Sequence, residues 1–414
     1  MSVAAPRQMP QPAPQPPVAR RVAERLPRGL RAIAWGAIGL GLLGAWIALP
    51  PVTVRSWAPS LAICAIAAAV GVGLIVRGER RFGGFAVAAG VLGFVLALLA
   101  TLSSLGKLET VVVWSALFAA MLRWATPLIF AAIGGMFSER SGVVNVGLEG
   151  MMLMGAFFAV LVTDKTGSWG LGLTAGTLSG GVAALVHAFF AIHLRADQIV
   201  SGMAVNFLAV GLTGYLYIDV YGQHGVRTDL PSIPDVHLDF LKDVGFVGPI
   251  FGQLNLMIWL ALLLIVVSWV AMFKTPVGLR IRSVGEHPKA ADTVGINVYA
   301  TRYVAVVLSG MLAAAGGAYL SIGFVGSFGQ NMTQGRGFIA LAALIFGNWR
   351  PFGAAAACLL FGFSSALALQ LKEYSESASV LFQALPYVVT LIAVAGVIGR
   401  SIPPAAVGRP YVKQ

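Results

Sequence analysis

The sequence predicts an all-α fold, a polytopic transmembrane helical bundle of about 11–12 spans. Of its 414 residues, 58% are hydrophobic and only 11% are charged, and the mean hydropathy is +0.84. Soluble domains have about 45–50% apolar and about 25% charged residues, so this composition indicates an integral membrane protein. Repeated apolar runs of about 18 or more residues favour helices over a β-barrel.

The formal net charge of +12 does not indicate a nucleic-acid partner. In a polytopic membrane protein an excess of Lys and Arg indicates cytoplasmic loops that face an anionic leaflet, so membrane lipid is the expected contact. Cys64 and Cys358 both lie in apolar runs. We therefore expect two buried thiols and no disulfide framework.

Four regions follow one another along the chain. Residues 1–31 are rich in Pro and Gln and end in a basic cluster, which is typical of a disordered tail. Residues 32–105 carry additional N-terminal transmembrane helices, the first of which starts too late and is too long for a cleavable signal peptide. Residues 106–400 form the main helical core, and residues 401–414 form a C-terminal tail.

The candidate spans are apolar segments separated by polar or glycine-rich breaks. They are residues 32–49, 59–76, 82–102, 124–139, 143–163, 169–193, 199–218, 254–273, 303–322, 338–346, 353–371 and 380–398. Residues 111–123 are apolar but join the next segment without a polar break. We interpret them as an interfacial helix ahead of Pro127, with one longer continuous helix as the alternative.

The distribution of basic residues predicts the orientation. With the N-terminus in the cytoplasm, 20 of the 28 Lys and Arg residues fall on the cytoplasmic side, and the acidic loop 221–252 lies outside. Positive residues concentrate on the cytoplasmic side of bacterial membrane proteins. We therefore expect a multi-pass protein of the bacterial plasma membrane with both termini in the cytoplasm.

Two segments are unusually short. Residues 338–346 are too few to cross a hydrocarbon core of about 30 Å at about 1.5 Å per residue, and they end in a helix-breaking Gly-Asn-Trp-Arg-Pro run. Residues 124–139 end in polar residues before the chain re-enters. Interrupted segments in corresponding positions of two halves indicate an inverted repeat with the substrate path between them. No residue-level repeat is visible, and a simple helical hairpin is the alternative.

Three polar residues inside apolar runs are candidates for the substrate path: Asn145, Glu149 and Asn206. Ionisable residues are costly in hydrocarbon and usually face a cavity or a partner. Asn145 and Glu149 lie four residues apart, on one expected helical face, where they line the path or hold the broken helix. The alternative is a helix-to-helix hydrogen bond beside a near-surface carboxylate. The Asn206 amide either binds a sugar hydroxyl or base edge, or joins two helices.

The stretch 274–302 is the longest strongly basic interruption of the apolar region. Its run PKAADTV opens with Pro288 and is followed by Gly295, which predicts a helix of about two turns. Ala290, Ala291 and Val294 give this helix one small, smooth face. The pattern indicates a docking element, and a solvated loop is the alternative.

Two quoted motifs carry a family resemblance. GLRIRSVGEHPKAADTVGIN resembles the cytoplasmic coupling loop of ATP-binding cassette (ABC) importer permeases of the branched-chain amino acid, ribose and nucleoside type. ATPLIFAAIGGMFSERSGVVNVGLEGMMLMGAF is similar to the opening of the nucleoside and simple-sugar branch, and the similarity runs from about Leu122 to Gly399. The resemblance implies that this loop fits a groove on a separate ATPase subunit through Gly285, Glu286, Pro288, Ala290, Ala291, Val294 and Gly295.

The resemblance implies a permease subunit that takes up nucleosides or a related simple sugar by alternating access. Its implied partners are ABC ATPase subunits, a second homologous permease subunit in an expected heterodimer, and an extracytoplasmic solute-binding protein. The sequence has no GxxxxGK[ST] phosphate loop, so ATP hydrolysis falls to a partner chain and we expect neither enzyme activity nor a bound cofactor. No metal site is expected either, because the five histidines lack metal-ligand spacing. The alternative is an ion-coupled secondary transporter of a small polar solute, with Glu149 as its candidate coupling residue.

Overall fold

The computed structural model describes residues 28–48, 58–77, 79–102, 114–222, 225, 230–241, 247–372 and 401–413. These residues are mostly helical, and six helices are long and apolar enough to cross a membrane. The strands in the described part, β1 (Asp235–His237) and β2 (Gln253–Asn255), form one short antiparallel pair. The polytopic all-α fold is thus confirmed. The last expected span, residues 380–398, lies outside the described residues.

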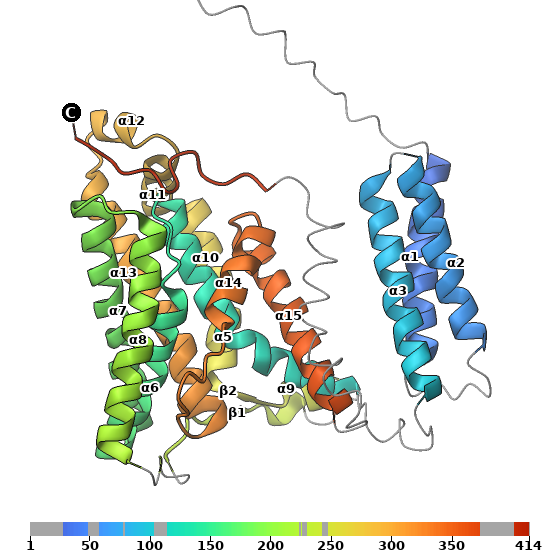
Figure 1. Ribbon diagram of the computed structural model, residues 1–414, viewed down its shortest axis with the longest axis horizontal. Helices are drawn as coiled ribbons and strands as arrows, with labels where there is room; N and C mark the ends of the chain where they lie inside the picture. The colour runs from blue at the N-terminus through green and yellow to red at the C-terminus, as the bar shows by residue number, and fades with distance from the viewer. Residues whose placement is uncertain are drawn as a thin grey trace, which may run out of the picture.

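The three N-terminal helices pack on one another as a separate unit (Figure 1). They are α1 (Arg28–Ala48), α2 (Ala58–Val76) and α3 (Arg80–Leu102). A Cβ on Gly90 of α3 would lie 2.6 Å from the backbone nitrogen of Ala68, so small residues allow these helices to approach closely. Residues 1–27 of the expected tail lie outside the described residues, and α1 already begins at Arg28.

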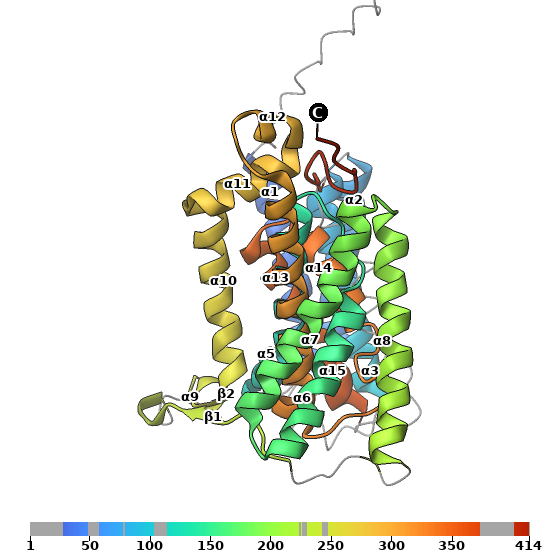
Figure 2. The ribbon, with the colours of Figure 1, turned by 90° about the vertical axis from the view of Figure 1, so that its left-hand side faces the viewer.

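The core consists of long helices with short elements between them. The long helices are α5 (Trp114–Arg140), α6 (Leu148–Thr166), α7 (Trp169–Ala188), α8 (Gln198–Tyr221), α10 (Leu256–Lys274), α13 (Val298–Ala318) and α15 (Pro351–Lys372). The shorter elements are η2 (Phe189–His193), η3 (Asp239–Leu241), α9 (Gly248–Phe251), α11 (Pro276–Glu286), α12 (Pro288–Thr293), η4 (Tyr319–Val325) and α14 (Arg336–Phe346). Helices α11 and α12 lie at one end of the core with residues 401–413, called the α12 end here, and β1, β2 and α9 lie at the opposite end (Figures 1 and 2).

Helix α5 corrects the interpretation of residues 111–123. Residues 114–123 do not form a separate interfacial helix, because α5 runs without interruption from Trp114 through Pro127 to Arg140, while residues 111–113 lie outside the described residues. Proline has no N–H, so the carbonyl of Arg123 loses its helical hydrogen bond. The Tyr319 hydroxyl donates to that carbonyl at 3.4 Å. A neighbouring helix thus satisfies the freed backbone group, as a membrane interior requires.

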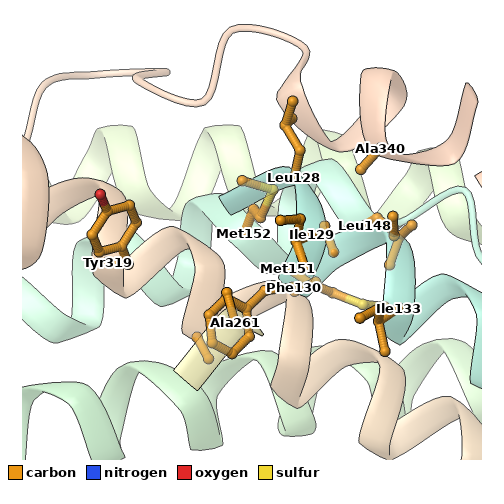
Figure 3. Close-up of a cluster of buried hydrophobic side chains, with 14 of the residues drawn as sticks. Leu128, Ile129, Phe130, Ile133, Leu148, Met151, Met152, Ala261, Tyr319 and Ala340 are labelled. Carbon is orange, nitrogen blue, oxygen red and sulfur yellow. The ribbon is translucent and has the colours of Figure 1, made fainter. Parts of the chain in front are cut away.

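The centre of the core lies where α5, α6 and α13 meet. Ile129 and Ile133 from α5 pack with Met151 and Met152 from α6 (Figure 3). Both methionines are fully buried, where their flexible side chains fill the irregular space between the helices. A Cβ on Gly134 would lie 2.6 Å from the carbonyl oxygen of Ser309. Helices α5 and α13 therefore touch backbone to backbone.

Candidate functional site

The first broken segment follows α5. Residues 141–147 are not helical although most of them are buried, and α6 begins only at Leu148. The helix of the expected span 143–163 therefore starts five residues later. The segment 124–139 is not short, because it is the second part of the long helix α5, and the break comes after it. Gly142 has φ +93°, and the Ser138 hydroxyl donates to the carbonyl of Val143 at 2.7 Å. Glycine thus ends the helix, and Ser138 satisfies a backbone carbonyl of the break that follows it.

The second broken segment follows α13 and its π-helical continuation η4. Residues 326–335 are not helical, Gly326 and Gly335 have positive φ, and α14 then runs for only 11 residues. This helix is about 16 Å long and covers about half of a ~30 Å hydrocarbon core. The prediction of a short, interrupted segment at residues 338–346 is confirmed.

The two broken segments run in opposite directions. The first begins at Arg140, whose side chain donates to the carbonyl of Trp349 and whose carbonyl lies against Gly285 of α11 at the α12 end. The second begins after Val325, which lines a cavity with Asp235 of β1 at the opposite end. This antiparallel arrangement is the one expected of an inverted repeat.

Glu149 joins the two broken segments. Its carboxylate lies in the first turn of α6 and accepts hydrogen bonds from the N–H groups of Gly335 at 2.7 Å and Gly337 at 2.6 Å. These N–H groups belong to the N-terminus of α14, where a helix has unpaired donors and partial positive charge. The residue is only 6% exposed. It therefore caps a helix start inside the protein, 186 residues away along the chain.

Asn206 and Asn145 hold the first broken segment in place. The Asn206 amide oxygen accepts from the N–H of Gly150 at 2.8 Å, and its nitrogen donates to the carbonyl of Val146 at 3.0 Å. Asn145 donates to the Ser309 hydroxyl at 2.9 Å. The expectation that Asn145 shares a helical face with Glu149 is wrong, because Asn145 precedes α6. The hydrogen bonds of Asn206 favour its interpretation as a residue that joins helices.

Sequence reasoning missed the partners of Val144 in the middle of this segment. Its N–H donates to the Gln198 side chain at 2.7 Å, and its carbonyl lies 3.0 Å from His187 Nε2. Both side chains are buried, and both are polar residues in or beside apolar runs, which was the available signal. Sequence reasoning also missed a repeated Ala-Ala-x-Gly-Gly at 131–135 and 313–317. This pattern stands shortly before each of the two breaks and was a signal that the two segments correspond.

The short helix expected after Pro288 is confirmed as α12, and Gly295 follows it with φ +85°. Its expected small face is only partly exposed, however. Val294 is 75% exposed, whereas Ala291 is 3% exposed and packs with Val284, Val298 and Tyr411. The inclusion of Ala291 in an exposed face was therefore wrong, because Tyr411 from the C-terminal tail covers it. Gly285 is also buried, against the end of α5.

A polar cavity of about 390 Å³ opens at the end opposite α12. It lies between the β1–β2 pair and the residues around η4, and its lining includes Asp235, His237, Gln253 and Asn255. Asn255 donates to the carbonyl of Ile233 at 2.8 Å, which fixes the cavity wall. Among the described residues, no group of three or more His, Cys, Asp or Glu side chains is placed to hold a metal ion.

Two oppositely directed broken segments, joined by a buried carboxylate within a bundle of apolar helices, are typical of membrane transport proteins. The chain belongs to the branched-chain amino acid transport system permease component family, whose profile matches residues 117–394.

Curated relatives cover most of the chain. It is 43% identical to the guanosine ABC transporter permease protein NupQ of Bacillus subtilis, over 74% of this chain and 99% of the relative. It is 43% identical to the nucleoside ABC transporter permease protein NupC of Lactococcus lactis, over 71% of this chain and 95% of the relative. The guanosine permease protein NupP of Bacillus subtilis is 28% identical, over 58% of this chain and 70% of the relative. A search of solved structures found no significant match.

Proposed function

We propose that this permease takes up nucleosides as one subunit of an ABC importer in a bacterial plasma membrane. Its similarity to NupQ and NupC over nearly their whole lengths supports a nucleoside, and a related simple sugar is the second candidate solute. The observation that carries the mechanism is the hydrogen bonding of Glu149 to the N-terminus of α14. It makes the starts of the oppositely directed helices α6 and α14 one connected unit.

In this proposal the solute path runs beside the two broken segments, and Asn145, Glu149 and Asn206 hold its wall. All three side chains are at least 94% buried and bond to protein groups. Because these side chains are occupied, the solute contacts free backbone groups and apolar side chains along the path. Such a lining suits an uncharged, polar molecule. The cavity beside η4 receives it from outside. Rocking of one half against the other changes which end of the path is open.

The proposed partners follow from the two ends of the molecule. Helix α12 and the exposed Val294 face the cytoplasm and dock into an ATPase subunit, while an extracytoplasmic solute-binding protein delivers solute at the β1–β2 end. The second permease subunit is of the NupP type. This is supported by the 43% identity to NupQ and the 28% identity to NupP, two guanosine permease proteins of one organism.

The proposal is tested by transport in vesicles that contain the permease pair and its ATPase, with ATP inside and binding protein outside. We expect ATP-dependent uptake of labelled guanosine that excess unlabelled cytidine or adenosine reduces and excess glucose does not. ATP-dependent uptake of glucose alone would replace the nucleoside by a sugar.

The ion-coupled alternative makes the opposite prediction. Vesicles that contain this chain alone should then take up guanosine when a proton or sodium gradient is imposed, without ATP. We expect no uptake above that of empty vesicles. Gradient-driven uptake that disappears in Glu149→Gln would establish the secondary transporter instead.

A further inference from the structure

Residues 401–413, here called the C-terminal strap, cross the α12 end of the molecule and contact several segments (Figure 1). The N–H of Ile402 donates to the Asn348 side chain at 3.1 Å, in the turn between α14 and α15. The N–H of Ala406 donates to the carbonyl of Gly285 at 2.9 Å, and the N–H of Gly408 donates to the carbonyl of Gly142 at 3.2 Å. The strap therefore touches the first break at Gly142 and the turn that follows α14 at Asn348.

The far end of the strap is anchored on α12 by Tyr411. This residue is 5% exposed and packs against Ala291 of α12. Its ring packs edge-on against that of Tyr299, with the two ring centroids 5.5 Å apart. Burial and a hydrogen bond to Asp292 raise the pKa of the Tyr411 hydroxyl to about 12. The hydroxyl therefore stays protonated at neutral pH and donates to a residue of the docking helix.

Arg302 joins the strap to the first broken segment. Its Nε donates to the carbonyl of Ser141 and its Nη1 to the carbonyl of Arg409, both at 3.2 Å, and the residue is only 1% exposed. A Cβ on Gly142 would lie 2.9 Å from the Arg302 guanidinium. The strap, the guanidinium and the start of the break are thus packed without spare room.

We propose that the C-terminal strap is a positioning element that transmits movement of α12 to both broken segments; this rests on the proposed function. Helix α12 has only six residues and is followed by a left-handed glycine, so its own chain connections hold its direction weakly. Tyr411 supplies a lateral attachment. The strap then carries displacement of α12 to Gly142 and Asn348, one in each half.

The test uses the complete complex with Tyr411→Ala, Tyr411→Phe and Lys413→Ala. The first removes the anchor, the second keeps its ring, and the third changes an exposed neighbour. We expect Tyr411→Ala to lower uptake about tenfold and to abolish stimulation of ATP hydrolysis by loaded binding protein. ATPase co-purification should stay within about twofold of wild type, since the exposed face of α12 is unchanged. Tyr411→Phe and Lys413→Ala should transport normally.

A chain that ends at residue 400 provides a second, independent removal of the strap. We expect it to insert, to co-purify with the ATPase and to lose stimulated hydrolysis, as Tyr411→Ala does. Normal uptake in both variants would make the strap a passive cover. Loss of ATPase co-purification in both would make it part of the docking surface and overturn a positioning role. Absence of ATP-dependent uptake in the wild-type complex would instead contradict the proposed function.

Discussion

The carboxylate of Glu149 accepts a 2.6 Å hydrogen bond from the N–H of Gly337, across 188 positions of sequence. The two backbones are also packed tightly, since a Cβ on Gly337 would lie only 2.5 Å from Glu149 Cα. Glu149 also stands in the first turn of its own helix. One negative charge therefore lies between two helix N-termini, each with partial positive charge, and stabilises both.

Replacement of this charge should impair transport. In Glu149→Gln one amide oxygen can still accept from an N–H, but the amide nitrogen faces the other N–H and the charge is lost. Hydrogen bonds to a charged group contribute about 1.5–3 kcal/mol, so we expect uptake to fall about tenfold or more. The measurement is uptake of labelled guanosine in vesicles with matched amounts of inserted complex.

Asp197→Asn is the matched control. Asp197 also caps a helix, by accepting from the N–H groups of Ile199 and Val200, but it is exposed. Asparagine caps helices about as well as aspartate, and water is available at this site. Uptake should therefore be normal. Equal losses in both variants would show that Glu149 has no special role in transport.

The contact should also resist added volume at Gly337. Gly337→Ala forces a methyl group against the backbone of Glu149, and overpacking of this kind costs about 1–3 kcal/mol. We expect a lower thermal unfolding midpoint and reduced uptake. Gly329→Ala, in the same non-helical segment with open space around its Cβ position, should change neither. An unchanged midpoint in Gly337→Ala would mean that the starts of α6 and α14 separate freely.

Composition, hydropathy and the placement of Pro and Gly were sufficient to predict the fold class, the short segment at 338–346 and the short helix after Pro288, because each depends on local pattern. The start of α6 was not predictable in this way. Residues 143–147 are apolar enough to continue a helix, but His187, Gln198 and Asn206 bind their backbone groups. Tertiary hydrogen bonds therefore decide where this helix begins.

The sequence identified the candidate residues as unusual, but only the structure shows which groups they bind. The cost of burying Glu149 and Asn206 marked them as special, yet their partners lie 186 and 56 positions away. The same limit explains Ala291. Its exposure depends on Tyr411, a residue more than a hundred positions later in a tail that carries little periodic pattern.

Asn206 should prove structural in kinetic tests. Asn206→Ala leaves the N–H of Gly150 and the carbonyl of Val146 without their partners, at a cost of about 1–3 kcal/mol for each buried group. The thermal midpoint should fall and the KM for guanosine should stay within about twofold of wild type. Phe207→Ala, at the adjacent position that is 71% exposed, should keep the wild-type midpoint. A large rise in KM at an unchanged midpoint would make Asn206 a solute ligand.

The orientation of the molecule is testable with single cysteines. Cys64 and Cys358 are both buried, so they give little background labelling. Ser232 lies beside the β1 strand and Lys413 lies in the strap at the α12 end, and both are exposed. We expect a membrane-impermeant thiol reagent to label Ser232→Cys in intact cells and Lys413→Cys only after permeabilisation. The reverse pattern would place α12 outside and exclude docking of a cytoplasmic ATPase.

Ala291 on α12 and Val294 directly after this helix should separate docking from folding. Val294 is 75% exposed, so Val294→Glu places a charge on the free face, where an ATPase subunit would have to bury it without a partner. We expect ATPase co-purification to fall at least about tenfold with an unchanged thermal midpoint, since exposed substitutions alter stability little. Ala291→Glu instead puts the carboxylate into the cluster of Val284, Val298 and Tyr411.

For Ala291→Glu the structure therefore predicts a lower midpoint, because an unpaired charge is costly in an apolar cluster. Any loss of ATPase binding in this variant should accompany unfolding of the α12 end. Ser232→Glu, on an exposed residue at the opposite end, serves as the control for added charge and should change neither property. If Val294→Glu retains full co-purification and full uptake while Ala291→Glu is merely unstable, α12 is a structural corner. The ATPase would then have to bind another surface of the α12 end.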